Sequence, residues 1–153
     1  MALASILLLY LVIGLLAATG AITLGRRRFS ARGESSFFAL LLLPIAAIYL
    51  AFLGYFGMPG ALRVEGIAVA SFALLALLGL RFAPLVPLAY FLHGAWDLLH
   101  ELSAHLSVQG GSERSLTAIP LAYGVFCAAF DWLVAGYFVS RLGAWRVQRE
   151  AGE

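Results

Sequence analysis

The sequence predicts an all-α, polytopic membrane protein, a bundle of five transmembrane helices. Hydrophobic residues make up 63% of the 153 residues and charged residues 12%, whereas soluble domains have about 25% charged residues. The mean hydropathy is +0.96. A membrane-spanning helix needs about 20 mainly apolar residues, and five stretches reach or approach that length: 3–24, 36–57, 63–80, 84–106 and 117–140. We therefore expect one integral membrane domain over residues 1–153, with the lipid bilayer as its main partner.

The first span is predicted to be a retained helix and not a cleaved signal peptide. No basic residue precedes it, and three arginines at residues 26–28 follow it, which reverses the charge order of a secretory signal. The polar residues 25–35 then predict a loop. Ser35 and Ser36 are the candidates for the N-cap of the second helix.

Turn-forming residues mark the remaining boundaries. Residues 56–60 contain two glycines and a proline, which is typical of a turn. Pro84 and Pro87 suit the first turn of a fourth helix. Residues 107–116 are polar and contain two adjacent glycines, so they predict the loop between the fourth and fifth spans.

The arginines predict the orientation of the bundle. All ten basic residues are arginines, and with five spans two of them, Arg63 and Arg114, fall on one side. The other eight share the opposite side: Arg26, Arg27, Arg28, Arg32, Arg81, Arg141, Arg146 and Arg149. Because cytoplasmic loops are enriched in basic residues, we expect the N-terminus outside and the C-terminus in the cytoplasm (N-out/C-in).

Five ionisable side chains interrupt the fourth span: His93, Asp97, His100, Glu101 and His105. A charged side chain near the bilayer centre costs at least about 2.5–3.5 kcal/mol, so such residues normally face protein or water and have a partner. At 100° per residue, His93, Asp97 and His100 fall within a sector of about 60°. Glu101 flanks this stripe, and His105 lies nearer the outer end. The pattern indicates a buried site.

The fifth span has a matching polar face, with Cys127 and Asp131 four residues apart. Counted inward from the outer boundary at the helical rise, His93 and Asp131 both lie at a depth of about 20 Å. Asp97 and Cys127 lie at about 14–15 Å by the same rise. We therefore expect the two polar faces to meet. Glu65, near the outer end of the third span, is expected to be an interfacial, solvated carboxylate.

The leading hypothesis for these residues is a metal site. Imidazole, carboxylate and thiolate groups are suitable ligands for zinc or iron, and helical bundles build such sites from facing helices. The candidate metal ligands are His93, Asp97, His100 and Asp131, with Cys127 as a further donor. Asp97 could instead be the acceptor that orients an imidazole.

In the same hypothesis Glu101 is the candidate catalytic residue, a general base toward metal-bound water. The reaction would be hydrolytic or redox chemistry on a lipid or other apolar substrate. Two alternatives stay open: a proton-coupled or solute transport component, and a structural or partner-binding subunit whose polar residues hold helices together. Homo-oligomer formation is left open as well.

Several function classes are excluded. The arginines are dispersed at the ends of the spans, so nucleic acid is not an expected partner. The sequence has no GxSxG motif, no glycine-rich phosphate loop and no CxxC pair, which argues against the common nucleophile and soluble-cofactor enzymes. One cysteine cannot form an intrachain disulfide.

Two motifs resemble those of a known group of proteins. The fourth span reads His93-x-x-Trp-Asp97-x-x-His100, and the fifth reads Cys127-x-x-x-Asp131-x-x-x-Ala-Gly-Tyr. The pair resembles a family of small, uncharacterised bacterial integral membrane proteins, mainly over residues 84–140. Where relatives tend to have a second histidine after the last one of the motif, this chain has Glu101. The resemblance implies a bacterial cytoplasmic membrane and a single site, and it implies no activity.

Overall fold

The computed structural model describes residues 2–110 and 116–150, and this part of the chain is all-α. The five helices are α1 (Ala2–Arg28), α2 (Ala31–Phe56), α3 (Leu62–Gly79), α4 (Leu85–Gly110) and α5 (Tyr123–Glu150). A short 3₁₀ helix, η1 (Pro59–Ala61), precedes α3. No strand occurs among the described residues. The predicted all-α class and the predicted number of helices are confirmed.

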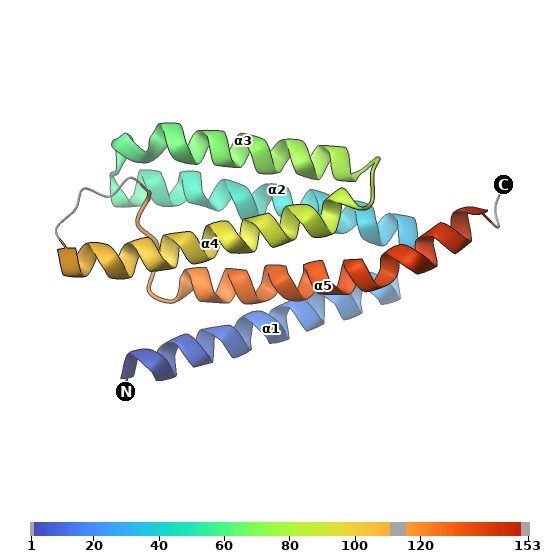
Figure 1. The fold of residues 1–153 in the computed structure, drawn as a ribbon, viewed down its shortest axis with the longest axis horizontal. Helices are drawn as coiled ribbons and strands as arrows, with labels where there is room; N and C mark the ends of the chain where they lie inside the picture. Colours follow the sequence, from blue (N-terminus) through green and yellow to red (C-terminus); the bar gives the residue numbers. More distant parts are fainter. Residues whose placement is uncertain (1, 111–115, 151–153) are drawn as a thin grey trace.

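The helices form a bundle in which each runs antiparallel to the one before it (Figure 1). The most extensive contacts of α4 are with α5, and α5 packs in turn against α1. On the other side, α3 contacts both α2 and α4. Helix α4 therefore lies in the interior of the bundle, between the α2–α3 pair and α5.

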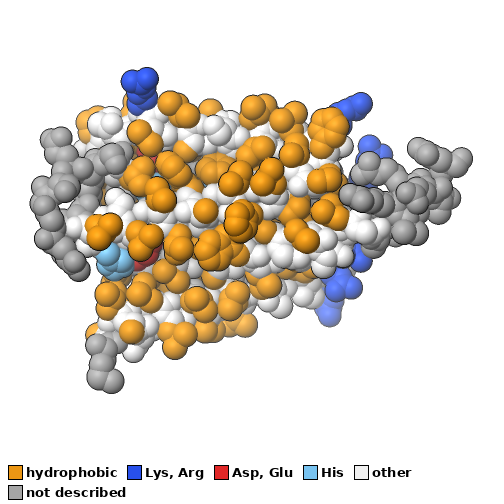
Figure 2. Space-filling view, in the orientation of Figure 1, with side chains coloured by type: hydrophobic (Ala, Val, Ile, Leu, Met, Phe, Trp, Pro, Cys, Tyr) orange, Lys and Arg blue, Asp and Glu red, His pale blue; other side chains and the backbone are white. Residues whose placement is uncertain are grey.

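The surface of the bundle is strongly apolar, with hydrophobic side chains over the length of the helices and basic side chains at their ends (Figure 2). Four helices are long and apolar enough to cross a membrane: Ala2–Arg28, Ala31–Phe56, Pro59–Gly79 and Tyr123–Gly143. Helix α4 is absent from this set because its histidines and carboxylates lower its hydropathy. The fold is therefore that of an apolar helical bundle compatible with a membrane protein.

The connection between α1 and α2 is much shorter than the predicted loop over residues 25–35. Helix α1 continues through Arg28, since arginine is a good helix former, and α2 begins at Ala31. The N-cap is Ser30, whose side chain accepts a hydrogen bond from the Gly33 N–H at 3.3 Å. The prediction of Ser35 or Ser36 as the cap was wrong, because both lie inside the helix.

The other helix ends agree with the prediction in part. The turn at residues 56–60 is confirmed: α2 ends at Phe56, and Gly57 adopts a φ of 65°, which glycine tolerates best. Helix α5 begins at Tyr123 and not at residue 117, because Ala122 adopts a φ of 61°, outside the right-handed helical region. Helix α4 extends through Gly110, and the rest of the predicted loop, residues 111–115, lies outside the described residues.

Two glycines let α4 and α5 approach closely at the level of the polar residues. A Cβ atom on Gly124 of α5 would lie 2.4 Å from the Asp97 carbonyl oxygen. A Cβ atom on Gly94 of α4 would lie 2.7 Å from Trp132 Nε1. Atoms cannot approach so closely, so a larger residue at Gly124 would push the two helices apart, whereas at Gly94 it would first displace the Trp132 side chain.

Candidate functional site

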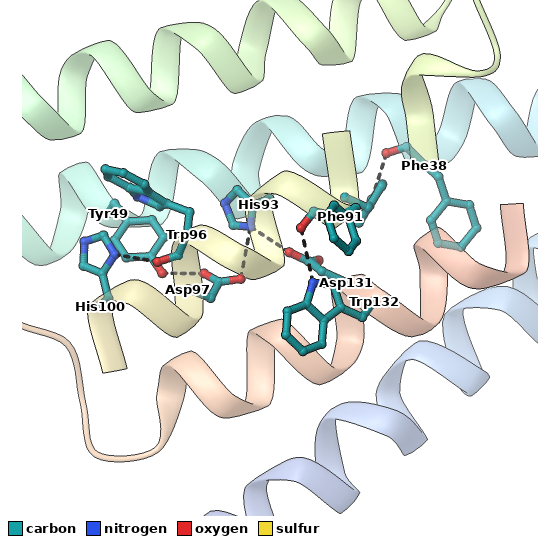
Figure 3. A network of polar contacts seen from close by, with 10 residues as sticks. Phe38, Tyr49, Phe91, His93, Trp96, Asp97, His100, Asp131 and Trp132 are labelled. Carbon is teal, nitrogen blue, oxygen red and sulfur yellow. Dashed lines mark hydrogen bonds and ion pairs between the residues drawn. The ribbon is translucent and has the colours of Figure 1, made fainter. Parts of the chain in front are cut away.

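His93 and Asp97 of α4 lie one turn apart and face Asp131 of α5 (Figure 3). His93 Nδ1 is 2.7 Å from Asp131 Oδ2 and 3.2 Å from Asp97 Oδ2. The three residues are at most 1% exposed. The predicted approach of His93 to Asp131 is confirmed, and the close α4–α5 packing explains it. These three residues are called the His/Asp group below.

Tyr49 of α2 completes the surroundings of the His/Asp group. Its hydroxyl donates a hydrogen bond to Asp97 Oδ1, and its side chain is fully buried. Sequence reasoning missed this residue, because tyrosine is common in membrane helices and nothing in the sequence fixes which face of α2 points inward. The contact holds one oxygen of Asp97 and leaves Oδ2 directed toward His93.

Several polar atoms of the group lack a hydrogen-bond partner among the described residues: His93 Nε2, Asp97 Oδ2 and Asp131 Oδ1. Asp97 Oδ2 lies 3.2 Å from His93 Nδ1, and the Asp97 carboxylate also lies against that of Asp131. Buried polar atoms are usually satisfied, since leaving one unpaired costs about 1–3 kcal/mol. The group therefore has unused capacity to bind a ligand.

Charge leads to the same conclusion. The His/Asp group has two carboxylates and one imidazole, and none of the ion pairs among the described residues involves an arginine. Two carboxylates in an apolar interior require positive charge or protons nearby. One divalent cation beside a neutral imidazole would make the group electrically neutral.

The geometry fits a metal ion. Each of the three residues offers one ligand atom, and these atoms all lie within 4.8 Å of one another. Four-coordinate zinc with ligand distances of about 2.0–2.2 Å has its ligand atoms about 3.4 Å apart, so the 2.7 Å contact between His93 Nδ1 and Asp131 Oδ2 would have to open for an ion to lie between them. The donor set, one nitrogen and carboxylate oxygens, suits zinc or iron.

His100, a predicted ligand, belongs to a different pair. Its Nε2 lies 2.8 Å from Glu65 Oε1 of α3, and its Nδ1 lies 3.0 Å from the Trp96 carbonyl oxygen. A carbonyl oxygen only accepts, so Nδ1 must be protonated. His100 is therefore engaged on both ring nitrogens.

Glu65 is not the solvated interfacial carboxylate that the sequence predicts. Its side chain is 0% exposed, and Oε1 also accepts a hydrogen bond from the Thr117 N–H at 2.8 Å. The sequence signal was its level near the outer end of its span, which predicts a possible approach to Glu101 and His105 and not to His100. Glu65 thus joins α3 to α4 and to the segment that leads into α5.

Glu101, the predicted general base, has three partners away from the His/Asp group. It accepts hydrogen bonds from the backbone N–H groups of Ala122 at 3.2 Å and Gly124 at 3.1 Å. His105 Nε2 lies 3.0 Å from it. These contacts are those of a carboxylate that caps the N-terminus of a helix. These contacts connect Glu101 to the start of α5 and place it apart from the His/Asp group.

Cys127 is buried on α5 at 5% exposure and lies against Tyr123. Its sulfur is not among the atoms that could share a metal ion with His93. Of the predicted ligands, the structure brings together His93, Asp97 and Asp131, and it places His100 and Cys127 outside that set.

Comparison with protein families gives one match. Residues 9–144 match the model described as "Family of unknown function (DUF6010)", and this range includes the whole His/Asp group. The match agrees with the resemblance to an uncharacterised family. Comparison with curated proteins and comparison with solved structures find no match.

Proposed function

This chain belongs to the DUF6010 family of unknown function, and we propose that it is an integral membrane protein that binds one divalent transition-metal ion. The ligands are His93, Asp97 and Asp131, and zinc or iron suits them best. One observation supports the proposal most: three buried donor groups lie within 4.8 Å of one another, with more negative charge than the imidazole can balance.

The surrounding residues would each contribute to this centre. Tyr49 holds Asp97 through Oδ1 and so orients the oxygen that faces His93, as outer residues do in known metal sites. A bound ion would act as a Lewis acid and activate water. A lipid or other apolar substrate would reach the centre from the bilayer. Hydrolytic or redox chemistry on such a substrate stays a prediction.

A proton or solute site is the second candidate function. It is favoured by the direct contacts of His93 Nδ1 with Asp97 and Asp131, because carboxylates and an imidazole at hydrogen-bond distance can exchange a proton without a metal ion. In that case protons supply the missing positive charge, and protonation changes as the bundle rearranges.

Elemental analysis of the purified protein separates the two functions. We expect close to one zinc or iron ion per chain at neutral pH. Occupancy should fall as the pH drops to the ordinary histidine pKa of about 6.5 and below, because imidazole and carboxylate ligands must be unprotonated to bind. Protein without metal that stays folded and active after chelation would contradict the metal proposal and favour the proton site.

The arginine distribution supports a topology of five spans, N-out/C-in, in a bacterial cytoplasmic membrane. Cysteine labelling on cells tests it, in a chain where Cys127 is first replaced by Ser. We expect Gly60→Cys, in η1, to react with an impermeant reagent on intact cells, and Phe29→Cys, between α1 and α2, to react only after permeabilisation. The reverse pattern would overturn the topology.

A further inference from the structure

A cavity lies at the end of the bundle where α2 begins and α3 connects to α4. Its volume is about 450 Å³, and it is lined by Arg32, Leu80, Arg81 and Phe82. Arg32 belongs to the first turn of α2, and the other three residues belong to the α3–α4 connection. Figure 2 shows basic side chains gathered at this end of the molecule. Two segments far apart in the sequence therefore bring two arginines to the lining of one cavity, which is open to the surface.

No described carboxylate forms an ion pair with the arginines of this cavity. Neither Arg32 nor Arg81 forms an ion pair with the described side chains of residues 2–106 and 116–143. The acidic residue nearest to Arg32 in sequence is Glu34, which is 2% exposed and accepts a hydrogen bond from the Tyr137 hydroxyl at 2.7 Å. Glu34 thus faces the bundle interior, and the two arginines remain available to an anion.

The shape and composition of the cavity favour a phosphate ester with an apolar part. A guanidinium group offers several N–H donors in a planar fork that matches phosphate oxygens. Beside the two arginines, Leu80 and Phe82 are 40% and 53% exposed. In a chain that spans a bilayer, the ends of the helices lie at the level of the lipid headgroups. A lipid there would place its phosphate near the arginines and its glycerol and acyl chains along Leu80 and Phe82.

We propose that the Arg32–Arg81 cavity binds the phosphate of an anionic membrane phospholipid. The site is separate from the His/Asp group and independent of whether that group binds a metal ion. Lipid binding here would fix the α3–α4 connection against the start of α2.

The test uses the full chain purified in a neutral detergent and titrated with phosphatidylglycerol, with bound lipid counted by native mass spectrometry. Each guanidinium is expected to donate charge-assisted hydrogen bonds to the phosphate, so we expect Arg32→Gln/Arg81→Gln to bind about 30-fold more weakly. Each single variant should bind about fivefold more weakly, which keeps the test valid if the double variant does not fold. Phosphatidylcholine, which has no net charge, should bind more weakly than phosphatidylglycerol to the wild type.

The matched control is Arg27→Gln/Arg28→Gln. It removes the same charge from the same end of the bundle but from residues that do not line the cavity, and we expect less than a threefold change. An equal loss in this control would show a general attraction by basic residues and overturn the site. Displacement of the lipid by millimolar inorganic phosphate would show a site for free phosphate and overturn the lipid assignment.

Discussion

Replacing His93 by Ala is expected to remove the bound metal ion from the purified protein, from close to one ion per chain to none. His93 supplies the only nitrogen ligand of the His/Asp group, and two carboxylates alone bind zinc or iron far less well than a mixed donor set. The measurement is elemental analysis after size-exclusion chromatography, together with a titration of metal into chelated protein.

Three control variants locate the site. His105→Ala and His100→Ala should keep the metal, because their rings face Glu101 and Glu65. Tyr49→Phe should keep the ligands but lower the affinity about 10–100-fold, the usual effect of losing a residue that orients a ligand. Loss of metal in His100→Ala with the fold intact would show that the ligand set extends beyond the His/Asp group.

Replacing Glu65 by Ala is expected to destabilise the bundle by about 2–4 kcal/mol. Removing one partner of a buried pair costs about 3–5 kcal/mol in soluble proteins, whereas a hydrogen bond between membrane helices contributes about 0.6 kcal/mol on average. Glu65 has two buried partners, His100 and the Thr117 N–H, so an intermediate value is expected. The measurement is the free energy of unfolding in mixed micelles.

Glu65→Gln is the matched control for this variant. It keeps the size of the side chain and an oxygen that can accept the Thr117 N–H, so we expect a smaller loss than for Glu65→Ala. Arg63→Gln, on the same turn of α3 but exposed, should change the free energy of unfolding by less than about 0.5 kcal/mol. If Glu65→Ala were as stable as Arg63→Gln, the pair with His100 would have no structural importance.

The sequence was sufficient to predict the five helices and the contact between His93 and Asp131. Long apolar stretches predicted the helices. Equal distances from the outer end of two antiparallel neighbouring helices predicted that the His93 and Asp131 side chains lie at one level. Both arguments use distance along a helix axis, which follows from the regular rise per residue. The polar stripe of α4 also showed which face of this helix points inward.

The sequence was not sufficient to predict the hydrogen-bond partners of Tyr49 and Glu65. The reason is that lipid, unlike water, does not select which face of a helix is apolar. In water, an amphipathic pattern shows which face of a helix is buried. In lipid, the outer face is as apolar as the inner one, so α2 and α3 have no such pattern. The rotation of each helix about its own axis brings Tyr49 to Asp97 and Glu65 to His100. This rotation is known from the packed structure and cannot be predicted from the sequence.

The hydrogen bonds of Tyr49 and Glu65 have a consequence for biogenesis. Both residues lie in helices that precede α4 in the chain, and domains form from the N-terminus during synthesis. When α4 enters the membrane, Tyr49 of α2 and Glu65 of α3 are already present. They can form hydrogen bonds with Asp97 and His100 before Asp131 has been synthesised. His93 is left without its carboxylate on α5 until the last helix arrives. A chain cut short before α5 would therefore insert with Asp97 and His100 already hydrogen-bonded. It would lack the metal centre, the backbone N–H groups that Glu101 binds and the Tyr137 hydroxyl that Glu34 binds.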